Sequence, residues 1–168
     1  MQYITYYNSA IGKLLLTADE IGLSGLWLEN EKDNTIHLDK KHEEKETEIL
    51  KQAKKWLDIY FEGKEPDFMP PLHITGTSFQ EEIWDILLTI PYGKTIAYGD
   101  IAQIIAKKRG IKRMSAQAVG GAVGHNKISI IIPCHRVIGK SGGLVGYAGG
   151  IDKKIYLLKL EKAYHDEF

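Results

Sequence analysis

The sequence predicts a mixed α/β (α+β) protein in which a small strand-rich unit precedes a mainly helical one. Its first 28 residues alternate short β-rich runs with turns, whereas apolar residues recur at helical spacing from residue 49 onward. Pro66, Pro70 and Pro71 lie between the two patterns and mark a linker. We therefore expect two domains, 1–75 and 76–168, in a chain of 168 residues.

Three N-terminal strands are expected over residues 3–7, 12–17 and 23–28, joined by turns at 8–10 and 19–22. The polar segment 29–45 is expected to be a loop or a frayed segment. A helix should follow, because one apolar stripe is formed by Ile49, Leu50, Ala53, Trp56, Leu57, Tyr60 and Phe61, and Gly63 ends the pattern. Its aromatic residues are better explained as core than as a ligand site.

The second part begins with a helix over 79–88, for which Thr77 and Ser78 are the capping candidates. A second helix contains residues 101–105, with Asp100 near its start, and a third covers 116–123 behind Ser115. A basic connection, residues 107–113, joins the last two, which is typical of a helix-turn-helix. The apolar run 128–132 is expected to be a strand that ends at Pro133.

The predicted helix 116–123 has almost no side-chain bulk. Its small residues are Ala116, Ala118, Gly120, Gly121 and Ala122. Each of the two glycines costs a helix roughly 1 kcal/mol relative to alanine. So small a surface allows close backbone approach, either to another helix or to a groove of nucleic acid, and the pattern alone leaves both explanations open.

The composition limits the classes of function. Hydrophobic residues make up 43% of the chain and charged residues 26%, as in ordinary globular proteins. No apolar run approaches the ~20 residues of a membrane span, and the N-terminus shows no secretory signal, so we expect a cytoplasmic protein. A single cysteine excludes a disulfide within the chain and any multi-cysteine metal site. The histidines without ligand partners at metal spacing, expected on the surface or in turns, are His37, His42, His73, His125 and His165.

The net charge of zero conceals an asymmetry between the two parts. Residues 1–75 carry 9 basic and 14 acidic residues, whereas residues 76–168 carry 13 basic and 8 acidic ones. Within 101–159 there are 11 basic residues and a single acid, Asp152. The second part should therefore present a positive face, although clustering by chance on a solvated surface explains the counts equally well.

Cys134 is followed directly by His135, a pair that suits an activated thiolate. Neighbouring side chains in a regular strand point to opposite faces, so the pair alone is a weak signal. Pro133 favours a turn here, which would bring sulfur and imidazole to one pocket.

Residues 133–137, Pro-Cys-His-Arg-Val, resemble the signature of the O6-alkylguanine-DNA alkyltransferases, also called methylated-DNA–protein-cysteine methyltransferases. The resemblance covers roughly residues 79–161 in matching order and spacing. It also takes in residues 90–95, 98–99, 118–122, Asn126, 146–150, Lys154, 157–158 and Glu161. It implies a ribonuclease-H-like N-terminal scaffold domain and a winged-helix-like C-terminal domain that binds DNA and accepts the alkyl group.

The resemblance also implies the chemistry. Cys134 matches the cysteine that accepts a methyl or alkyl group from O6-alkylguanine, and from O4-methylthymine, after the base is flipped out of the duplex. His135 matches the histidine that deprotonates the thiol through a water, and Glu161 the glutamate that orients it. Tyr98 matches a residue that supports base flipping and the leaving guanine, and Asn126 one that structures the active-site turn.

The remaining matches concern substrate and DNA. Val137 and Tyr147 match pocket walls, and the backbone amide of Ala148 matches a contact to guanine O6. Arg136 is expected to be an ion-pair partner rather than a catalyst. Lys154 either sets the environment of Cys134, which we favour, or lies on a basic face. The helix containing Ala118 and Gly120 would enter the minor groove of double-stranded DNA, bound by a monomer with weak sequence preference.

Two positions depart from the family pattern. Gln117 stands where the family usually carries an arginine that enters the duplex, so we expect Arg113, one helical turn earlier, to supply the cationic part of that role. Lys127 stands where proline commonly follows the asparagine, which affects the turn geometry rather than the chemistry.

Three alternatives remain from other classes. A helix-turn-helix regulator explains the basic half but not the cysteine motif with a matched glutamate. A damage-binding alkyltransferase-like protein lacks the cysteine that this chain retains. A cysteine hydrolase shares the Cys–His pair but needs turnover and usually an oxyanion hole. The resemblance instead implies a single-turnover acceptor that forms a stable thioether and requires no cofactor.

Overall fold

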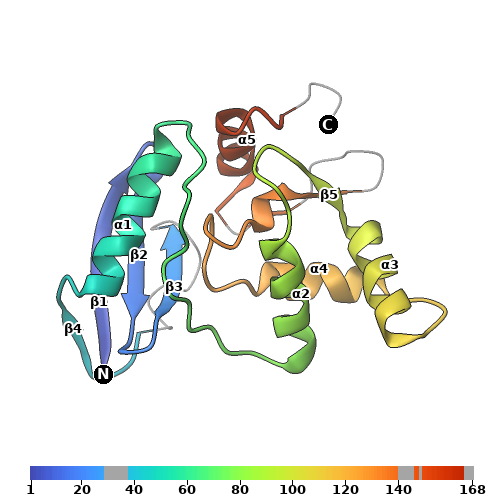
Figure 1. Ribbon diagram of the computed structural model, residues 1–168, viewed down its shortest axis with the longest axis horizontal. Helices are drawn as coiled ribbons and strands as arrows, with labels where there is room; N and C mark the ends of the chain where they lie inside the picture. Colours follow the sequence, from blue (N-terminus) through green and yellow to red (C-terminus); the bar gives the residue numbers. More distant parts are fainter. Residues whose placement is uncertain (29–37, 140–145, 148, 165–168) are drawn as a thin grey trace. The chain divides into compact units, whose positions relative to one another are not determined.

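The computed structural model describes residues 1–28, 38–139, 146–147 and 149–164. The chain divides into two compact units (Figure 1). The first contains Met1–Thr75 together with Lys127–Ser129, and the second contains Gly76–Asn126 and Ile130–Phe168. No feature of the sequence indicated that residues 127–129 lie with the first unit.

A four-stranded sheet forms the first unit, in the order β3-β2-β1-β4. The predicted strands are confirmed as β1 (Gln2–Ser9), β2 (Gly12–Ala18) and β3 (Leu23–Leu28), which pair antiparallel in sequence order. The expectation of a loop over 29–45 is wrong at its end. There β4 (His42–Glu44) pairs parallel with the start of β1, a short edge strand whose three residues are all exposed.

Helix α1 (Glu48–Phe61) covers one face of this sheet (Figure 1). The side chain of Thr47 accepts a hydrogen bond from the backbone N–H of Leu50 and so caps the helix. Leu50, Leu57 and Tyr60 have no exposed surface, which confirms that the apolar stripe is core. Each such side chain contributes about 1.5–3 kcal/mol of hydrophobic free energy when fully buried.

Two segments extend the first unit beyond its sheet. The linker joins the start of β3 through hydrogen bonds between Leu23 and Pro71 and between His73 and Leu23. Residues 127–129 pair in parallel with Leu26, whose N–H donates to the carbonyl of Lys127 at 2.9 Å. Both contacts use backbone groups at the sheet edge, which satisfies donors and acceptors that an edge strand otherwise leaves open.

Helices α2 (Ser78–Leu88), α3 (Tyr98–Arg109) and α4 (Ala116–Gly124) build the second unit. Thr77 and Gln80 form a reciprocal capping box at the start of α2, and Ser115 caps α4, as predicted. Figure 1 shows α4 crossing α2 and reaching α3, and it packs against both. The indole of Trp84 donates to the backbone carbonyl of Ala122 at 3.0 Å, which fixes α2 to α4.

The segment before the cysteine is not the strand that its apolar residues predict. Ile128 makes one bridge, and residues 129–132 form turns in which Ile130 takes φ +70°, an unfavourable conformation for a β-branched residue. The chain then makes a single 3₁₀ turn, Cys134–Arg136, and enters β6 (Val137–Ile138). Strand β6 pairs in parallel with β5 (Ile96–Ala97), which leads directly into α3.

Helix α5 (Ile151–Leu160) completes the second unit. Its inward residues Leu157 and Leu158 are fully buried, and Glu161 follows as its last, C-capping position. No helix within the described residues combines the length and apolar character that crossing a membrane requires.

Candidate active site

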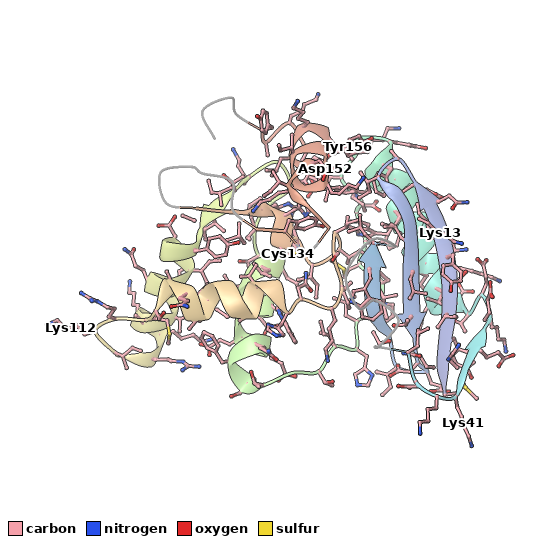
Figure 2. All side chains as sticks on the ribbon, turned by 180° about the vertical axis from the view of Figure 1, so that it is seen from behind. Lys13, Lys41, Lys112, Cys134, Asp152 and Tyr156 are labelled. Carbon is pink, nitrogen blue, oxygen red and sulfur yellow. The ribbon has the colours of Figure 1, made fainter. Side chains whose placement is uncertain are left out.

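Cys134 opens the 3₁₀ turn, and its N–H donates to the carbonyl of Ile132 at 2.8 Å. Figure 2 shows it inside the second unit, whereas Lys112 stands at the outer end of the connection between α3 and α4. Only 9% of the cysteine's surface is exposed. A reaction partner must therefore enter the unit to reach the sulfur.

His135 forms a buried pair with Glu161. The Nε2 atom of the ring lies 2.6 Å from Glu161 Oε2, and neither side chain has exposed surface. A carboxylate only accepts hydrogen bonds, so Nε2 carries the proton and Nδ1 carries the ring's lone pair. This tautomer is the one that a general base requires.

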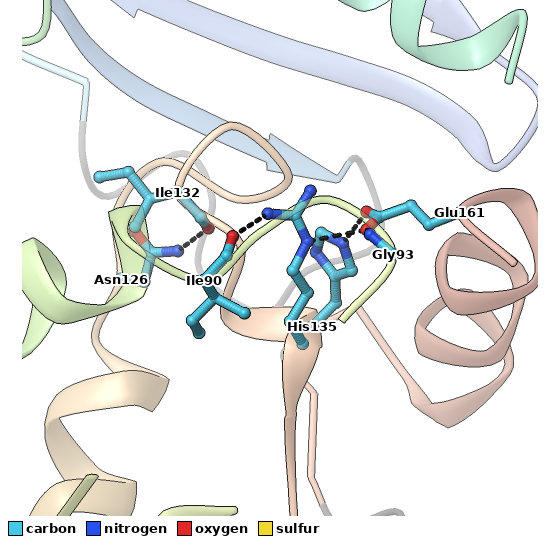
Figure 3. Close-up of polar contacts among 7 residues, drawn as sticks. Ile90, Gly93, Asn126, Ile132, His135 and Glu161 are labelled. Carbon is cyan, nitrogen blue, oxygen red and sulfur yellow. Dashed lines mark hydrogen bonds and ion pairs between the residues drawn. The ribbon is translucent and has the colours of Figure 1, made fainter. Parts of the chain in front are cut away.

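Glu161 receives two further hydrogen bonds, both at its other oxygen (Figure 3). Arg136 Nε donates to Oε1 at 2.7 Å, and the N–H of Gly93 donates to it at 3.0 Å. Burial acts to raise the pKa of Glu161, but the hydrogen bonds and charges of His135 and Arg136 outweigh it and lower that pKa to about 2. The carboxylate is therefore ionised at neutral pH.

Burial is also the main influence on His135, and it lowers the pKa of the imidazole. The positive charges of Arg136 and Lys154 lower it further, against the opposing effect of Glu161. The ring is neutral at neutral pH, so it can take up a proton.

Lys154 lies on α5 with no exposed surface. Its Nζ donates to the carbonyl of Val137 at 2.6 Å and to that of Gly146 at 3.4 Å. Burial lowers the pKa of the ammonium to about 8, while its interaction with Cys134 acts in the opposite direction. That interaction supports the interpretation that Lys154 sets the environment of the cysteine rather than lying on a basic face.

Asn126 bridges the turn that precedes the cysteine. Its Nδ2 donates to the carbonyl of Ile132 at 2.8 Å, and the side chain is almost fully buried (Figure 3). The Lys127 side chain donates to the carbonyl of Thr75 at 2.9 Å, a contact that the proline common at this position in the family cannot make.

Tyr98 is the first residue of α3 and is half-buried. Burial and its interaction with Cys134 raise the pKa of its hydroxyl, so the hydroxyl stays protonated at neutral pH. Its ring lies 3.9 Å from the position a Cβ would take at Gly120, which brings it against α4. Val137 is fully buried in β6, and Tyr147 is half-buried; Ala148 lies outside the described residues.

On α4, Gln117 and Ala118 are exposed, and Gly120 is half-buried. Arg113 is exposed in the connection that precedes the helix. Arg113, Gln117 and Ala118 are therefore exposed just before and within the first turn of α4.

Two contributors to the site were not assigned from the sequence. Arg136 was expected as an ion-pair partner, and it does form an ion pair with Glu161, but nothing indicated that this partner is the glutamate bound to His135. Gly93 lies in the segment 90–95 that carries the resemblance, but no contact with the glutamate was predicted for it. Its φ of +79°, and the 3.2 Å that would separate an added Cβ from the Glu161 carbonyl oxygen, explain why glycine stands there.

Within the described part of the chain, no group of three or more His, Cys, Asp or Glu residues is arranged to hold a metal ion. His73 was expected on the surface or in a turn; it lies in the linker with 36% of its side chain exposed, but it has a partner that the sequence did not indicate. Its Nδ1 lies 2.5 Å from Asp19 Oδ2, while backbone N–H groups of Ile21 and Gly22 donate to the other oxygen of that aspartate. This pair fastens the linker to the turn between β2 and β3.

Comparison with known families gives two matches that together span most of the chain. The 6-O-methylguanine DNA methyltransferase ribonuclease-like domain matches residues 2–74, and the DNA binding domain of the same name matches residues 78–163.

Similar proteins agree with these matches. The methylated-DNA–protein-cysteine methyltransferase of Haemophilus influenzae is 40% identical over 95% of this chain and 86% of its own length. The protein of that name from Methanosarcina acetivorans is 42% identical over 95% and 97%. Among solved structures, the OGT of Mycobacterium tuberculosis in complex with DNA is 40% identical and covers 96% of this chain and 93% of its own, with a TM-score of 0.81.

These matches confirm the resemblance carried by residues 133–137 and the two-part α/β fold. The chain belongs to the 6-O-methylguanine DNA methyltransferase family.

Proposed function

We propose that this protein repairs DNA by transferring the methyl or alkyl group of O6-alkylguanine, and of O4-methylthymine, to its own Cys134. The observation that carries this proposal is the buried, neutral His135 held by Glu161 directly beside the sole cysteine. The likeness to relatives called methylated-DNA–protein-cysteine methyltransferases supports the same reaction.

The transfer is a displacement at the alkyl carbon. His135 Nδ1 takes the thiol proton through a water, and Lys154 and the protonated His135 stabilise negative charge on the sulfur. The sulfur then forms a bond to the alkyl carbon as the carbon–O6 bond breaks and its electron pair goes to the guanine. The protonated hydroxyl of Tyr98 donates a hydrogen bond to the departing base, which takes up one proton overall. The product is a thioether that no group in the site can hydrolyse, so each molecule acts once and no cofactor takes part.

The alkylated base must leave the duplex to reach a sulfur with so little exposed surface. We assign the approach to α4, whose residues Gln117, Ala118 and Gly120 allow close contact with the minor groove of double-stranded DNA. Val137, Tyr147 and Ala148 would line the pocket for the flipped base. The similar OGT of Mycobacterium tuberculosis was solved in complex with DNA, which supports DNA as the partner of this protein.

The first unit would serve as a scaffold, and the protein would act as a monomer. We place the reaction in the cytoplasm, where a reducing environment keeps the single thiol available.

Mass spectrometry after incubation with a duplex that contains O6-methylguanine tests the proposal. We expect one added methyl group per protein molecule, with no further turnover, and Cys134→Ala should accept none while binding the duplex with nearly unchanged affinity. A matched duplex with unmodified guanine is the control. Repeated turnover would indicate a hydrolase, and binding without a mass gain would indicate a damage-binding protein or a regulator; either result contradicts the proposal.

A further inference from the structure

Arg136 links two parts of the second unit around the carboxylate of Glu161. Its Nε donates to Glu161 Oε1 at 2.7 Å, and its Nη1 donates to the carbonyl of Ile90 at 2.7 Å. The guanidinium also lies 5.8 Å from the ring centroid of Tyr92. Only 9% of the Arg136 side chain is exposed. These contacts tie the 90–93 turn, the 3₁₀ turn and the end of α5 together.

We propose that Arg136 is a positioning residue for the transfer: it fixes the Glu161 carboxylate so that one oxygen faces His135, and its charge adds to the effect of burial in disfavouring the imidazolium. The inference rests on the proposed function, because it explains how the base of that reaction is kept ready.

Geometry supports the first half of this role. Arg136 and the Gly93 N–H occupy Oε1, so Oε2 is left to the imidazole. A guanidinium donates from Nε and Nη1 in fixed, divergent directions, so it can serve Glu161 and Ile90 at once. A lysine in its place has one nitrogen on a flexible stem and can hold only one of these partners firmly.

The charges around the ring support the second part of this role, the effect of Arg136 on the protonation of His135. The groups that act on His135 come from several elements: Arg136 shares its own turn, Lys154 lies on α5, and Glu161 caps that helix. Tyr98 of α3 interacts with Cys134, and Tyr92 of the 90–93 turn lies beside Arg136. Glu161 favours the imidazolium, whereas Arg136 and Lys154 oppose it together with burial. Removing Arg136 leaves the negative charge of Glu161 acting on the ring with less compensation.

The test compares Arg136→Gln and Arg136→Lys with the wild-type protein. Lys54→Gln is the matched control, since Lys54 also pairs with a glutamate, Glu46, but lies on α1 in the first unit. Single-turnover transfer from an O6-methylguanine duplex is measured across pH, and the His135 ring protons are titrated by NMR without DNA.

For Arg136→Gln we expect two midpoints to rise together by about one pH unit: that of the acidic limb of the pH–rate profile, and that of the NMR titration of His135. The transfer rate on the acidic limb should be roughly tenfold lower than in the wild type. For Arg136→Lys we expect the midpoint to stay near that of the wild type while the rate falls at every pH. Lys54→Gln should change neither the midpoints nor the rate. The NMR titration needs no transfer activity, so it tests Arg136 even where the proposed function fails.

Unshifted midpoints in Arg136→Gln would show that Arg136 only stabilises the fold. If Arg136→Gln does not fold, Arg136→Lys decides the matter, because wild-type rates in that variant contradict the positioning role and a uniform loss supports it. Recovery of the rate on adding methylguanidinium to Arg136→Lys would support it independently.

Discussion

Glu161 is a carboxylate without exposed side-chain surface, and burial of an unpaired charge of this kind costs several kcal/mol. Three donors compensate for this cost: the imidazole of His135, the guanidinium of Arg136 and the backbone N–H of Gly93. The same contacts that orient His135 therefore also stabilise the folded protein.

This pairing predicts how stability depends on pH. The folded pKa of Glu161, about 2, lies below its ordinary value of 4.5, so the ionised carboxylate stabilises the fold above pH 4.5. That stabilisation, roughly 3 kcal/mol, should be lost as the pH falls from 4.5 toward 2. His135, whose pKa is also lowered, adds a loss that begins as the pH falls through its ordinary value of 6.5. Urea unfolding at a series of pH values measures both.

Glu161→Gln should be less stable than the wild type at pH 7 by about 3–5 kcal/mol, because it leaves Arg136 buried without a counter-charge. It should also lack the loss of stability that the wild type shows as the pH falls from 4.5 to 2. The exposed Glu62 provides the control, and Glu62→Gln should behave as the wild type does. Equal acid sensitivity in Glu161→Gln and the wild type would contradict the assignment of the carboxylate as ionised in the folded state.

The sequence predicted the contact between His135 and Glu161 but not the further hydrogen bonds of that glutamate. The motif around Cys134 predicted the pair of His135 with Glu161, because a resemblance carries both residue types and spacing. It did not predict that Gly93, 68 residues away from Glu161, donates to the same carboxylate. Such a contact depends on how the 90–93 turn packs against the end of α5, which no local pattern encodes.

At the level of elements, helices α1, α2 and α4 were predicted closely because their signals are local, whereas α5 was not predicted. Thr77 and Ser115 cap α2 and α4 as their sequence positions indicate, and Thr47 caps α1 although it was not predicted to do so. The apolar run 128–132 was misread because β propensity reflects packing more than backbone preference. Here tertiary contacts hold Ile130 at positive φ and turn the chain toward Cys134.

Helix α4 contains small residues that lower its stability but allow another molecule to approach its backbone closely. Gly121 is exposed and helical, and a Cβ added there meets no atom within 4 Å. Neither packing nor backbone conformation within the described residues requires glycine at this position. Of the two explanations for the small side chains of α4, close approach by nucleic acid accounts for this glycine better than helix packing does.

Gly121→Ala should therefore stabilise the protein by about 0.5–1 kcal/mol, through the lower conformational entropy of the unfolded chain. We expect it to weaken binding to an O6-methylguanine duplex at the same time, because the added methyl group holds the groove away from the helix. Thermal unfolding and fluorescence anisotropy measure the two effects, and the gain in stability serves as the control for folding. A more stable variant with unchanged DNA affinity would exclude this face of α4 as the contact surface.

Across the whole molecule, charge is divided between the two parts of the sequence. The 11 basic residues of 101–159 belong mainly to the unit that contains Cys134, whereas the acidic excess lies in residues 1–75. Lys112 and Lys41, both exposed, stand in the second and the first unit respectively (Figure 2). DNA binding should follow this division, since affinity for phosphates depends on local positive charge and falls as salt rises.

Arg113 provides the sharpest test of that division, because we propose that it, rather than Gln117, supplies the cationic support for base flipping. Arg113→Ala should weaken duplex binding and reduce the slope of log affinity against log salt by about one, as expected for one lost phosphate contact. Lys41→Ala, the matched removal of an exposed cation from the first unit, should leave affinity and slope unchanged. Gln117→Ala removes no charge, so it should lower affinity without changing the slope. A large loss for Gln117→Ala beside no loss for Arg113→Ala would overturn the assignment, and equal slopes for Arg113→Ala and Lys41→Ala would show that the basic half does not direct binding.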